Sequence, residues 1–214
     1  MSATTVHLVR HGEVHNPDGI LYGRMAGFHL SERGHEMAQR VAAALADREV
    51  VHLVSSPLER ARQTAEPLAG RLGLEVQTDP RIVEAGSRLE GLRLAGATRV
   101  LRTPAAWRHL WNPVRPSWAE PYAEVVARMS RAVDDARDAA RGHEAVLVSH
   151  QMPIWATALH LQGRRLMHDP RRRRCALCSI TSLEFDGDVL TSLTYSEPAA
   201  DLLPVPGARV RRPD

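Results

Sequence analysis

The chain has 214 residues, and its 28 basic side chains against 25 acidic ones give a formal net charge of +3 at neutral pH. All 28 basic residues are arginine, and the chain contains no lysine. This excludes a Schiff-base lysine, a lysine general base and the phosphate-binding loop that requires a lysine. An anion bound by charge must therefore meet guanidinium groups, which are planar and suited to bidentate contact. Codon bias in a GC-rich genome is an alternative cause of the arginine content, and it leaves this consequence unchanged.

The composition is that of an ordinary folded domain, with 43% apolar and 25% charged residues. The length suits one domain with its own core, and the chain shows no repeat or linker, so we expect a single domain over residues 1–214. No apolar run is long enough to span a membrane, and the N-terminus lacks a signal-peptide pattern. We therefore expect a cytoplasmic protein without membrane contact.

Short apolar runs alternate along the chain with segments of helical periodicity. Buried strands are predicted at Val6–Val9, Val50–Val54 and Ala145–Ser149. A late hairpin is predicted from strands at 179–185 and 189–195 around Asp186 and Gly187. Strands that alternate with helices predict an α/β fold, a three-layer sandwich with a mostly parallel central sheet and helices on both faces.

Four helices are predicted from their capping and first-turn residues. Ser31 and Ser56 are candidate N-caps, the latter followed by proline at the first helical position. Pro121 opens a long helix, and Pro153 opens another after the third strand. Residues from about 84 to 120, which come before the Pro121 helix, are irregular in pattern, and the tail at about 200–214 is expected to be poorly ordered.

The two cysteines, Cys175 and Cys178, form a single CxxC pair. The surrounding sequence is typical of a strand, in which residues three apart point to opposite faces. This predicts ordinary buried thiols, with neither a disulfide nor a metal site.

Unusual polar residues follow the ends of the three buried strands. They are Arg10 and His11 after the first, Ser55 to Arg60 after the second, and Ser149 and His150 after the third. Ligands of open α/β sheets collect at the carboxyl ends of the strands. We therefore expect two histidines and two arginines to converge on one rim.

Those residue types suit phosphoryl transfer. A neutral imidazole is a nucleophile that can form a covalent intermediate, and arginines can compensate the charge on the phosphoryl oxygens. A loop glycine lets backbone N–H groups approach the anion, and a proton donor for the leaving oxygen completes the set.

Four segments in chain order resemble motifs of the histidine phosphatase superfamily, the group that includes cofactor-dependent phosphoglycerate mutase. The segment Arg10–Glu13 resembles its RHG signature, and Ser55–Ala65 resembles its second-arginine segment. Arg81–Glu84 resembles the segment with an acidic proton donor, and Val146–His150 resembles the second-histidine strand. The likeness touches roughly residues 4–195.

The resemblance implies a role for each residue. His11 would be the nucleophile that becomes phosphohistidine, and Glu84 would protonate the leaving alcohol and then activate water. Arg10, Arg60 and His150 would bind the phosphoryl group and stabilise its transition state. Because the first step needs a protonated carboxyl group, we expect a raised pKa for Glu84.

The full set of expected substrate-binding residues is Arg10, Gly12, Asn16, Arg60, His150 and Gln151. Three features depart from the family pattern. Asn16 lies six positions after Arg10, where family members often have an asparagine at seven. The segment Glu84–Gly91 is about one residue short and lacks an aromatic residue, and Gln151 replaces a common glycine.

Other charged groups are expected to have no part in metal or nucleic-acid binding. His7, His11 and His15 share a four-residue spacing, but the first lies in a predicted strand, so no metal site is expected. Arg171–Arg174 is interpreted as a solvated loop. Aromatic residues make up only 4% of the chain, which disfavours base stacking. We expect no cofactor and no nucleic-acid partner, and a homodimer is left open.

Residues 84–120 resemble the variable cap-like insertion that sets specificity in the family. Their arginines either lie on the solvated surface or line the mouth of the site. These are Arg88, Arg93, Arg99, Arg102, Arg108 and Arg115.

The sequence thus predicts a phosphatase that hydrolyses a small phosphorylated metabolite through phospho-His11. A phosphoglycerate mutase-type transferase is the alternative within the family, although such mutases tend to be longer. A non-catalytic arginine-rich binding module is a third hypothesis, disfavoured by the complete set of site residues. The sequence does not name the substrate.

Overall fold

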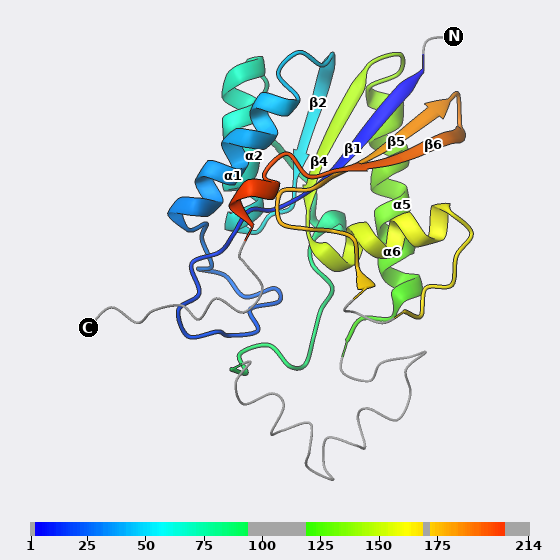
Figure 1. Cartoon of the computed structure of the whole chain (residues 1–214). Helices are drawn as coiled ribbons and strands as arrows, with labels where there is room; N and C mark the ends of the chain where they lie inside the picture. Colours follow the sequence, from blue (N-terminus) through cyan, green and yellow to red (C-terminus); the bar gives the residue numbers. More distant parts are fainter. Residues whose placement is uncertain (1–2, 94–118, 169–171, 204–214) are drawn as a thin grey trace.

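A six-stranded sheet with helices on both faces forms the centre of the molecule (Figure 1). The structure is a computed structural model that describes residues 3–93, 119–168 and 172–203. Its strands are β1 Thr4–Arg10, β2 Val50–Ser55, β3 Gln77–Thr78, β4 Glu144–Ser149, β5 Ile180–Asp186 and β6 Val189–Ser196. Its α-helices are α1 Glu32–Ala44, α2 Glu59–Leu72, α5 Tyr122–Ala139 and α6 Gln151–Leu161. Short 3₁₀ helices span Pro80–Ile82 and Ala200–Leu202.

The strand order is β3-β2-β4-β1-β5-β6, and the first four of these strands run parallel. β5 pairs antiparallel with β1 and with β6, so the predicted hairpin is confirmed. In the register of the parallel strands, Arg10 lies beside Ser149, and Ser55 lies beside Val148. The carboxyl ends of β1, β2 and β4 therefore meet at one edge, and the predicted α/β sandwich is confirmed.

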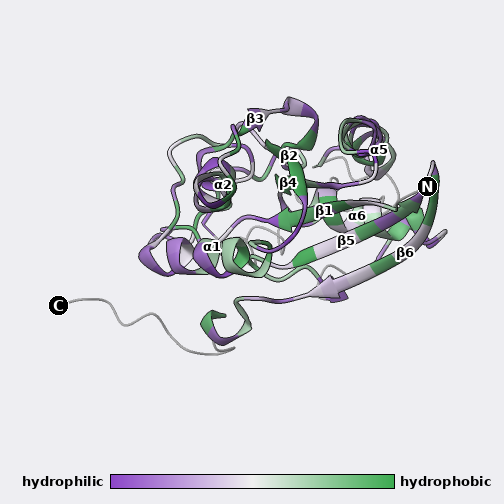
Figure 2. Cartoon of the chain, turned by 90° about the horizontal axis from the view of Figure 1, so that it is seen from above, coloured by the Kyte–Doolittle hydropathy of each residue, from purple (hydrophilic) through white to green (hydrophobic). Residues whose placement is uncertain are grey.

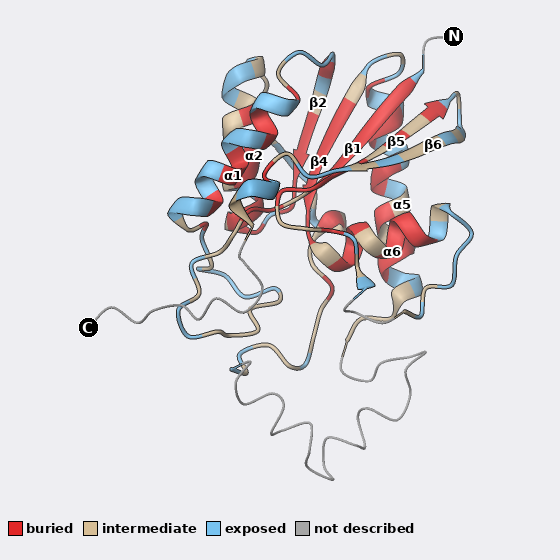
Figure 3. Cartoon of the chain, in the orientation of Figure 1, coloured by how far each residue is buried: buried red, intermediate tan, exposed pale blue. Residues whose placement is uncertain are grey.

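Each face of the sheet carries its own core, because successive residues of a strand point to opposite sides. On β4, Ala145 and Leu147 pack with α5 and α6, whereas Val146 and Val148 pack with α1 and α2. Figure 2 shows the sheet between these two pairs of helices. The central strands β1 and β4 are almost entirely buried, and the edge strand β6 is largely exposed (Figure 3). This accounts for the uninterrupted apolar run of β4.

Helix starts were predicted with mixed success. The Ser31 side chain accepts a hydrogen bond of 3.0 Å from the Gly34 N–H, so its predicted cap is confirmed. The predicted start at Ser56 is wrong, because α2 begins at Glu59 and the Ser56 hydroxyl bonds His150 instead. α6 begins at Gln151, two residues before the predicted start, since the first turn of a helix tolerates a proline.

The strand predicted around the two cysteines is also wrong. The segment from Cys175 to Ser179 is a turn that comes before β5, and Cys178 has a positive φ of 54°. The turn wraps the end of β1: the Cys178 N–H donates to the Arg10 carbonyl, and Arg10 donates to the Cys175 carbonyl. Both thiols are free and buried, as predicted.

Two predicted regions lie largely outside the described residues. Only 84–93 and 119–120 of the irregular middle are described, and they are loop apart from isolated β-bridges. Residues 200–203 of the predicted tail hold the last 3₁₀ helix, and 204–214 are not described. Among the described helices, none combines the length and apolar character needed to cross a lipid bilayer.

The segment after β1 rests directly on the start of α1 through two glycines. A Cβ atom on Gly12 would lie 2.6 Å from the Gly34 carbonyl oxygen, and one on Gly34 would lie 2.1 Å from the Glu13 carbonyl oxygen. Both distances are too short for real contacts, so only glycine allows this approach.

Gly34→Ala should therefore lower the free energy of unfolding by about 1–3 kcal/mol, because the helix and the loop must move apart. Gly70→Ala is a matched control, because Gly70 lies within α2 with open space around its Cβ position. It should raise that free energy by about 0.5–1 kcal/mol. Urea denaturation measures both, and equal effects would contradict the packing described here.

Candidate active site

Three residues that directly follow parallel strands are placed side by side by backbone hydrogen bonds. The His11 N–H donates to the Ser149 carbonyl at 3.1 Å, and the Ser56 N–H donates to the Val148 carbonyl at 2.9 Å. These bonds extend the ladders of β1 and β2 against β4 by one residue. His150 follows Ser149, so both histidines and Ser56 lie at the same edge of the sheet.

The His11 ring is buried, and its protonation is fixed by a neighbour. Its Nδ1 lies 2.8 Å from the Gly12 carbonyl oxygen, which only accepts, so Nδ1 carries the proton and Nε2 keeps a lone pair. Burial, and then the charges of Arg10 and Arg60, hold the pKa of His11 well below its ordinary value. His11 is therefore a neutral imidazole at neutral pH.

The second histidine lies against the first, with the ring centroids of His11 and His150 5.1 Å apart. His150 Nε2 and the Ser56 hydroxyl form a hydrogen bond of 2.8 Å. Burial, together with the charges of Arg60 and Arg10, holds the pKa of His150 well below its ordinary value. Its other ring nitrogen, Nδ1, is buried and has no hydrogen-bond partner among the described residues.

The fully buried side chain of Arg60 is held by two contacts. One Nη2–H donates to the Gly23 carbonyl at 2.6 Å, and the guanidinium carbon lies 4.7 Å from the centroid of the Tyr22 ring. Arg10 donates through Nη1 to the Cys175 carbonyl at 2.6 Å. Burial lowers the pKa of Arg60, but a guanidinium stays protonated in proteins.

The two arginines nevertheless keep free donors. Nε of Arg10, and Nε and Nη1 of Arg60, are buried without a hydrogen-bond partner in the described part of the chain. Buried N–H groups of a cation are costly to leave unpaired. With His150 Nδ1 they form a set of four unpartnered polar atoms around His11. An anion bound there would satisfy them.

Glu84, the acid expected from the sequence, follows the 3₁₀ helix Pro80–Ile82. Its Oε1 accepts from the Ala85 N–H at 2.8 Å. Burial raises the pKa of Glu84, although the Ala85 N–H and the charges of Arg10 and Arg60 oppose the shift. The direction agrees with the expectation from sequence, and it favours a carboxyl group that can donate a proton.

A cleft of about 700 Å³ adjoins these side chains, and the fully buried Arg60 and His150 do not line it. Arg10, His11 and Glu84 lie on its wall, with Gln151 at the start of α6. Much of the remaining wall is apolar. It includes Leu21, Tyr22, Leu89, Tyr122, Met152 and Met167.

Two of the expected substrate-binding residues are used elsewhere. The Gly12 N–H donates to the Thr64 hydroxyl at 3.0 Å, so this glycine serves close packing. The Asn16 side chain closes its own loop through hydrogen bonds to the backbone of Ile20, and it does not line the cleft. The roles of Gly12 and Asn16 in binding stay predictions.

Sequence reasoning missed Tyr22, Ser56 as the partner of His150, and Arg173. Tyr22 is one of only three tyrosines, and its place in the loop that follows His11 was a usable signal. Arg173 had been assigned to a solvated loop, but it lines the cleft and donates to His168 at 2.9 Å. No local pattern reveals the Ser56 contact, which joins residues 94 positions apart.

Of the six arginines expected in the irregular segment, two lie among the described residues. Arg88 is exposed, and Arg93 forms an exposed ion pair of 3.0 Å with Asp18. The other four fall outside the described residues: Arg99, Arg102, Arg108 and Arg115. In the part of the chain that the structure describes, no cluster of three or more potential ligands could hold a metal ion.

A family model of the histidine phosphatase superfamily (branch 1) matches residues 6–198 of the chain. The chain belongs to this superfamily. Membership explains why four short motifs far apart in sequence meet at one sheet edge. It does not by itself assign a substrate, nor the roles of individual residues.

Individual members of the superfamily align over most of the chain. The uncharacterized protein Rv0525 of Mycobacterium tuberculosis is 55% identical over 197 residues, which cover 92% of this chain and 98% of that one. "Probable phosphoglycerate mutase GpmB" of Yersinia enterocolitica is 31% identical over 185 residues, 84% of each chain. The mycobacterial glucosyl-3-phosphoglycerate phosphatase Rv2419c, solved with VO3, superposes with a TM-score of 0.73 and 27% identity. That superposition covers 90% of this chain and 98% of the other.

The unpartnered donors predict a specific loss in the Arg60→Met variant. Its binding of orthovanadate should weaken by about 10- to 150-fold, since each hydrogen bond to a charged group contributes roughly 1.5–3 kcal/mol. Arg62→Met is the control, because Arg62 is an exposed residue of the same helix. Isothermal titration calorimetry measures the affinity. Equal binding by the two variants would show that Arg60 does not hold the anion.

Proposed function

We propose that the protein is a phosphatase that hydrolyses phosphomonoesters through a phosphohistidine on His11. The observation that carries the proposal is the neutral His11 ring beside the unpartnered donors of Arg10 and Arg60. A phosphoryl group placed at those donors puts phosphorus next to the nucleophile. The relative named as a glucosyl-3-phosphoglycerate phosphatase supports hydrolysis as the reaction class.

The first step moves the phosphoryl group from substrate to protein. The lone pair of His11 Nε2 attacks phosphorus, and the bond from phosphorus to the ester oxygen breaks. Glu84 gives its proton to the leaving oxygen, which departs as an alcohol. The guanidinium groups of Arg10 and Arg60 compensate the charge on the other phosphoryl oxygens.

The second step reverses the role of Glu84. Its carboxylate takes a proton from water, the water oxygen attacks phosphorus, and the bond from phosphorus to Nε2 breaks. Inorganic phosphate leaves, and Glu84 is again protonated. In both steps the Ser56 hydroxyl donates to His150 Nε2, which leaves the proton on Nδ1 for the phosphoryl oxygens.

A mutase is the second candidate, because the relative named GpmB is described as a phosphoglycerate mutase. A mutase returns the phosphoryl group to the organic molecule, whereas a phosphatase gives it to water. Phosphate release measured against isomerisation of 3-phosphoglycerate separates the two. We propose with it that the partner is a small phosphorylated metabolite. The same proposal includes a cytoplasmic location and no nucleic-acid or membrane partner.

The experiment is a screen of phosphate release over a panel of phosphorylated metabolites. On the best substrate, His11→Ala should lose about 10³-fold or more in kcat, because the variant lacks the imidazole that forms the proposed intermediate. His15→Ala serves as the control, since His15 is an exposed residue of the following loop. A His11→Ala variant as active as the wild type would refute the mechanism.

A further inference from the structure

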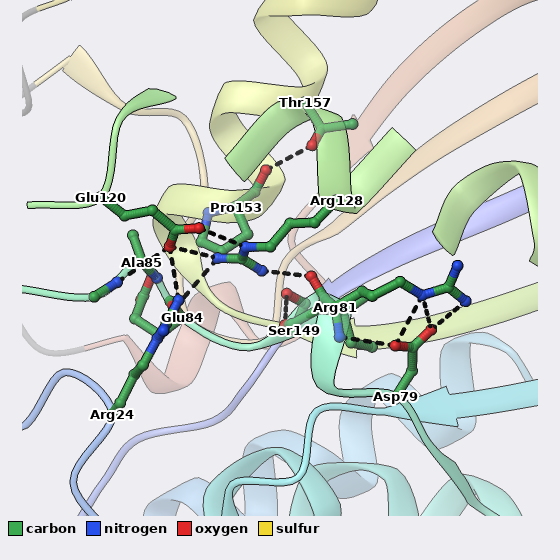
Figure 4. Close-up of polar contacts among 12 residues, drawn as sticks. Arg24, Asp79, Arg81, Glu84, Ala85, Glu120, Arg128, Ser149, Pro153 and Thr157 are labelled. Atoms are coloured by element: carbon green, nitrogen blue, oxygen red, sulfur yellow. Dashed lines mark hydrogen bonds and ion pairs between the residues drawn. The ribbon is translucent and has the colours of Figure 1, made fainter. Parts of the chain in front are cut away.

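The loop that carries Glu84 is tied down by a second carboxylate, that of Glu120. Glu120 Oε2 accepts hydrogen bonds from Arg24 Nη2 at 2.6 Å, from Arg128 Nη2 at 3.1 Å and from the Gly86 N–H at 3.3 Å. Its Oε1 accepts from Arg128 Nε at 2.9 Å. We call Glu120, Arg24 and Arg128 the Glu120 clamp (Figure 4).

The same two arginines also hold the main chain of Glu84. Its carbonyl oxygen accepts from Arg24 Nε at 2.6 Å and from Arg128 Nη2 at 3.3 Å. Arg128 Nη1 donates to the Arg81 carbonyl as well. The clamp thus joins the loop that carries Arg24, the Glu84 loop and helix α5.

Backbone contacts continue the clamp along the Glu84 loop. The Glu120 N–H donates to the Gly86 carbonyl at 2.8 Å, and Ser87 and Ala119 form an isolated antiparallel bridge. Ser149, at the end of β4, donates its hydroxyl to the Ile82 carbonyl at 2.7 Å. The loop is therefore fixed on one side by the sheet and on the other by Glu120.

The ion pair between Glu120 and Arg128 within the clamp is largely shielded from solvent. The Arg128 and Glu120 side chains are only 12% and 16% exposed, and Arg128 contacts both carboxylate oxygens. Burial opposes ionisation of Glu120, but the hydrogen bonds and charge of Arg128 outweigh it and lower the pKa. The contact between Arg128 and Glu120 is bidentate. An exposed surface ion pair, in contrast, contributes little to stability.

None of the three clamp residues lines the cleft, although their neighbours Gly23, Glu84 and Ala119 do. Their hydrogen bonds end on the main chain next to the acid. We propose that Glu120 is a positioning residue that holds Glu84 where it can protonate the leaving oxygen. This inference rests on the proposed phosphatase function.

A positioning role predicts that the loss depends on the leaving group. An alkyl phosphate releases a poor leaving group that needs a proton, whereas p-nitrophenyl phosphate releases a phenolate that does not. A displaced Glu84 should therefore slow phosphoryl transfer from the first ester to His11 and spare the same transfer from the second. A merely structural role would slow both alike.

The experiment compares kcat/KM for glycerol 2-phosphate and p-nitrophenyl phosphate in wild type, Glu84→Gln and Glu120→Gln. This constant reports the steps up to departure of the leaving group, so it excludes the later attack of water, which is common to both esters. Since general acid catalysis contributes about 10²–10⁴-fold, Glu120→Gln should lose about 10- to 100-fold on the alkyl ester. Its loss on p-nitrophenyl phosphate should stay below about threefold, because that ester needs no acid. Glu84→Gln should show the same selectivity to a greater extent.

Glu144→Gln is the matched control. Glu144 is 14% exposed and paired with Arg48 at 2.7 Å and His7 at 2.8 Å, but it lies at the opposite end of β4. It should leave the ratio of the two kcat/KM values unchanged. Arg24→Gln removes only the more exposed arm of the clamp, so it tests the inference even where Glu120→Gln fails to fold. It should show a smaller selective loss, and Glu120→Asp should restore part of the activity.

The outcomes separate this inference from the proposed function. A wild type that hydrolyses neither ester overturns both. Selective loss in Glu84→Gln, without it in Glu120→Gln and Arg24→Gln, overturns the clamp alone. Equal loss on both esters in Glu84→Gln removes Glu84 as the donor and the clamp with it, while phosphatase activity stands. Selective loss in all three variants supports the clamp.

Discussion

The structure depends on a cluster of buried cationic and imidazole groups whose hydrogen bonds are incomplete. Arg60 is fully buried, and Arg10 ends β1 beside it, yet three of their N–H groups have no partner in the described residues. Folding normally avoids such groups because their desolvation is not compensated. Here the uncompensated donors surround a neutral histidine, so an anion completes the set. Burial also holds the pKa of His11 well below its ordinary value and raises the pKa of Glu84, the directions that the two proposed roles require.

The surroundings keep this cluster in place from several directions. The ladders of β1 and β2 against β4 fix the backbone at His11 and Ser56, and two glycines let the following loop rest on α1. Tyr22 covers Arg60 from the same loop. The Glu120 clamp holds the acid from the far side. The supports at His11 and Ser56 act directly next to strand ends, which is why motifs far apart in sequence meet at one edge.

Much of this could be predicted from local sequence. Apolar runs predict three of the four parallel strands, and the residues after those three meet because parallel strands end at one edge. The predictions that were wrong concern segments whose structure depends on contacts between residues far apart in sequence. The Ser56 hydroxyl bonds His150 rather than capping a helix, and the cysteine segment turns because it wraps Arg10. The partners of Glu120 lie as far away as Arg24, so no window of sequence reveals them. The prediction of a cap-like insertion falls mostly on residues 94–118, which lie outside the described part of the chain.

The central claim is that His11 takes the phosphoryl group covalently, and the most direct measurement is to trap that intermediate. The protein is mixed with its best substrate, quenched in alkali within one turnover, digested and analysed by tandem mass spectrometry. The account predicts a phosphoryl adduct on the peptide that contains His11, lost on mild acid treatment and absent from His11→Ala. Steady turnover with no adduct on His11, or with an adduct on another residue, would contradict it.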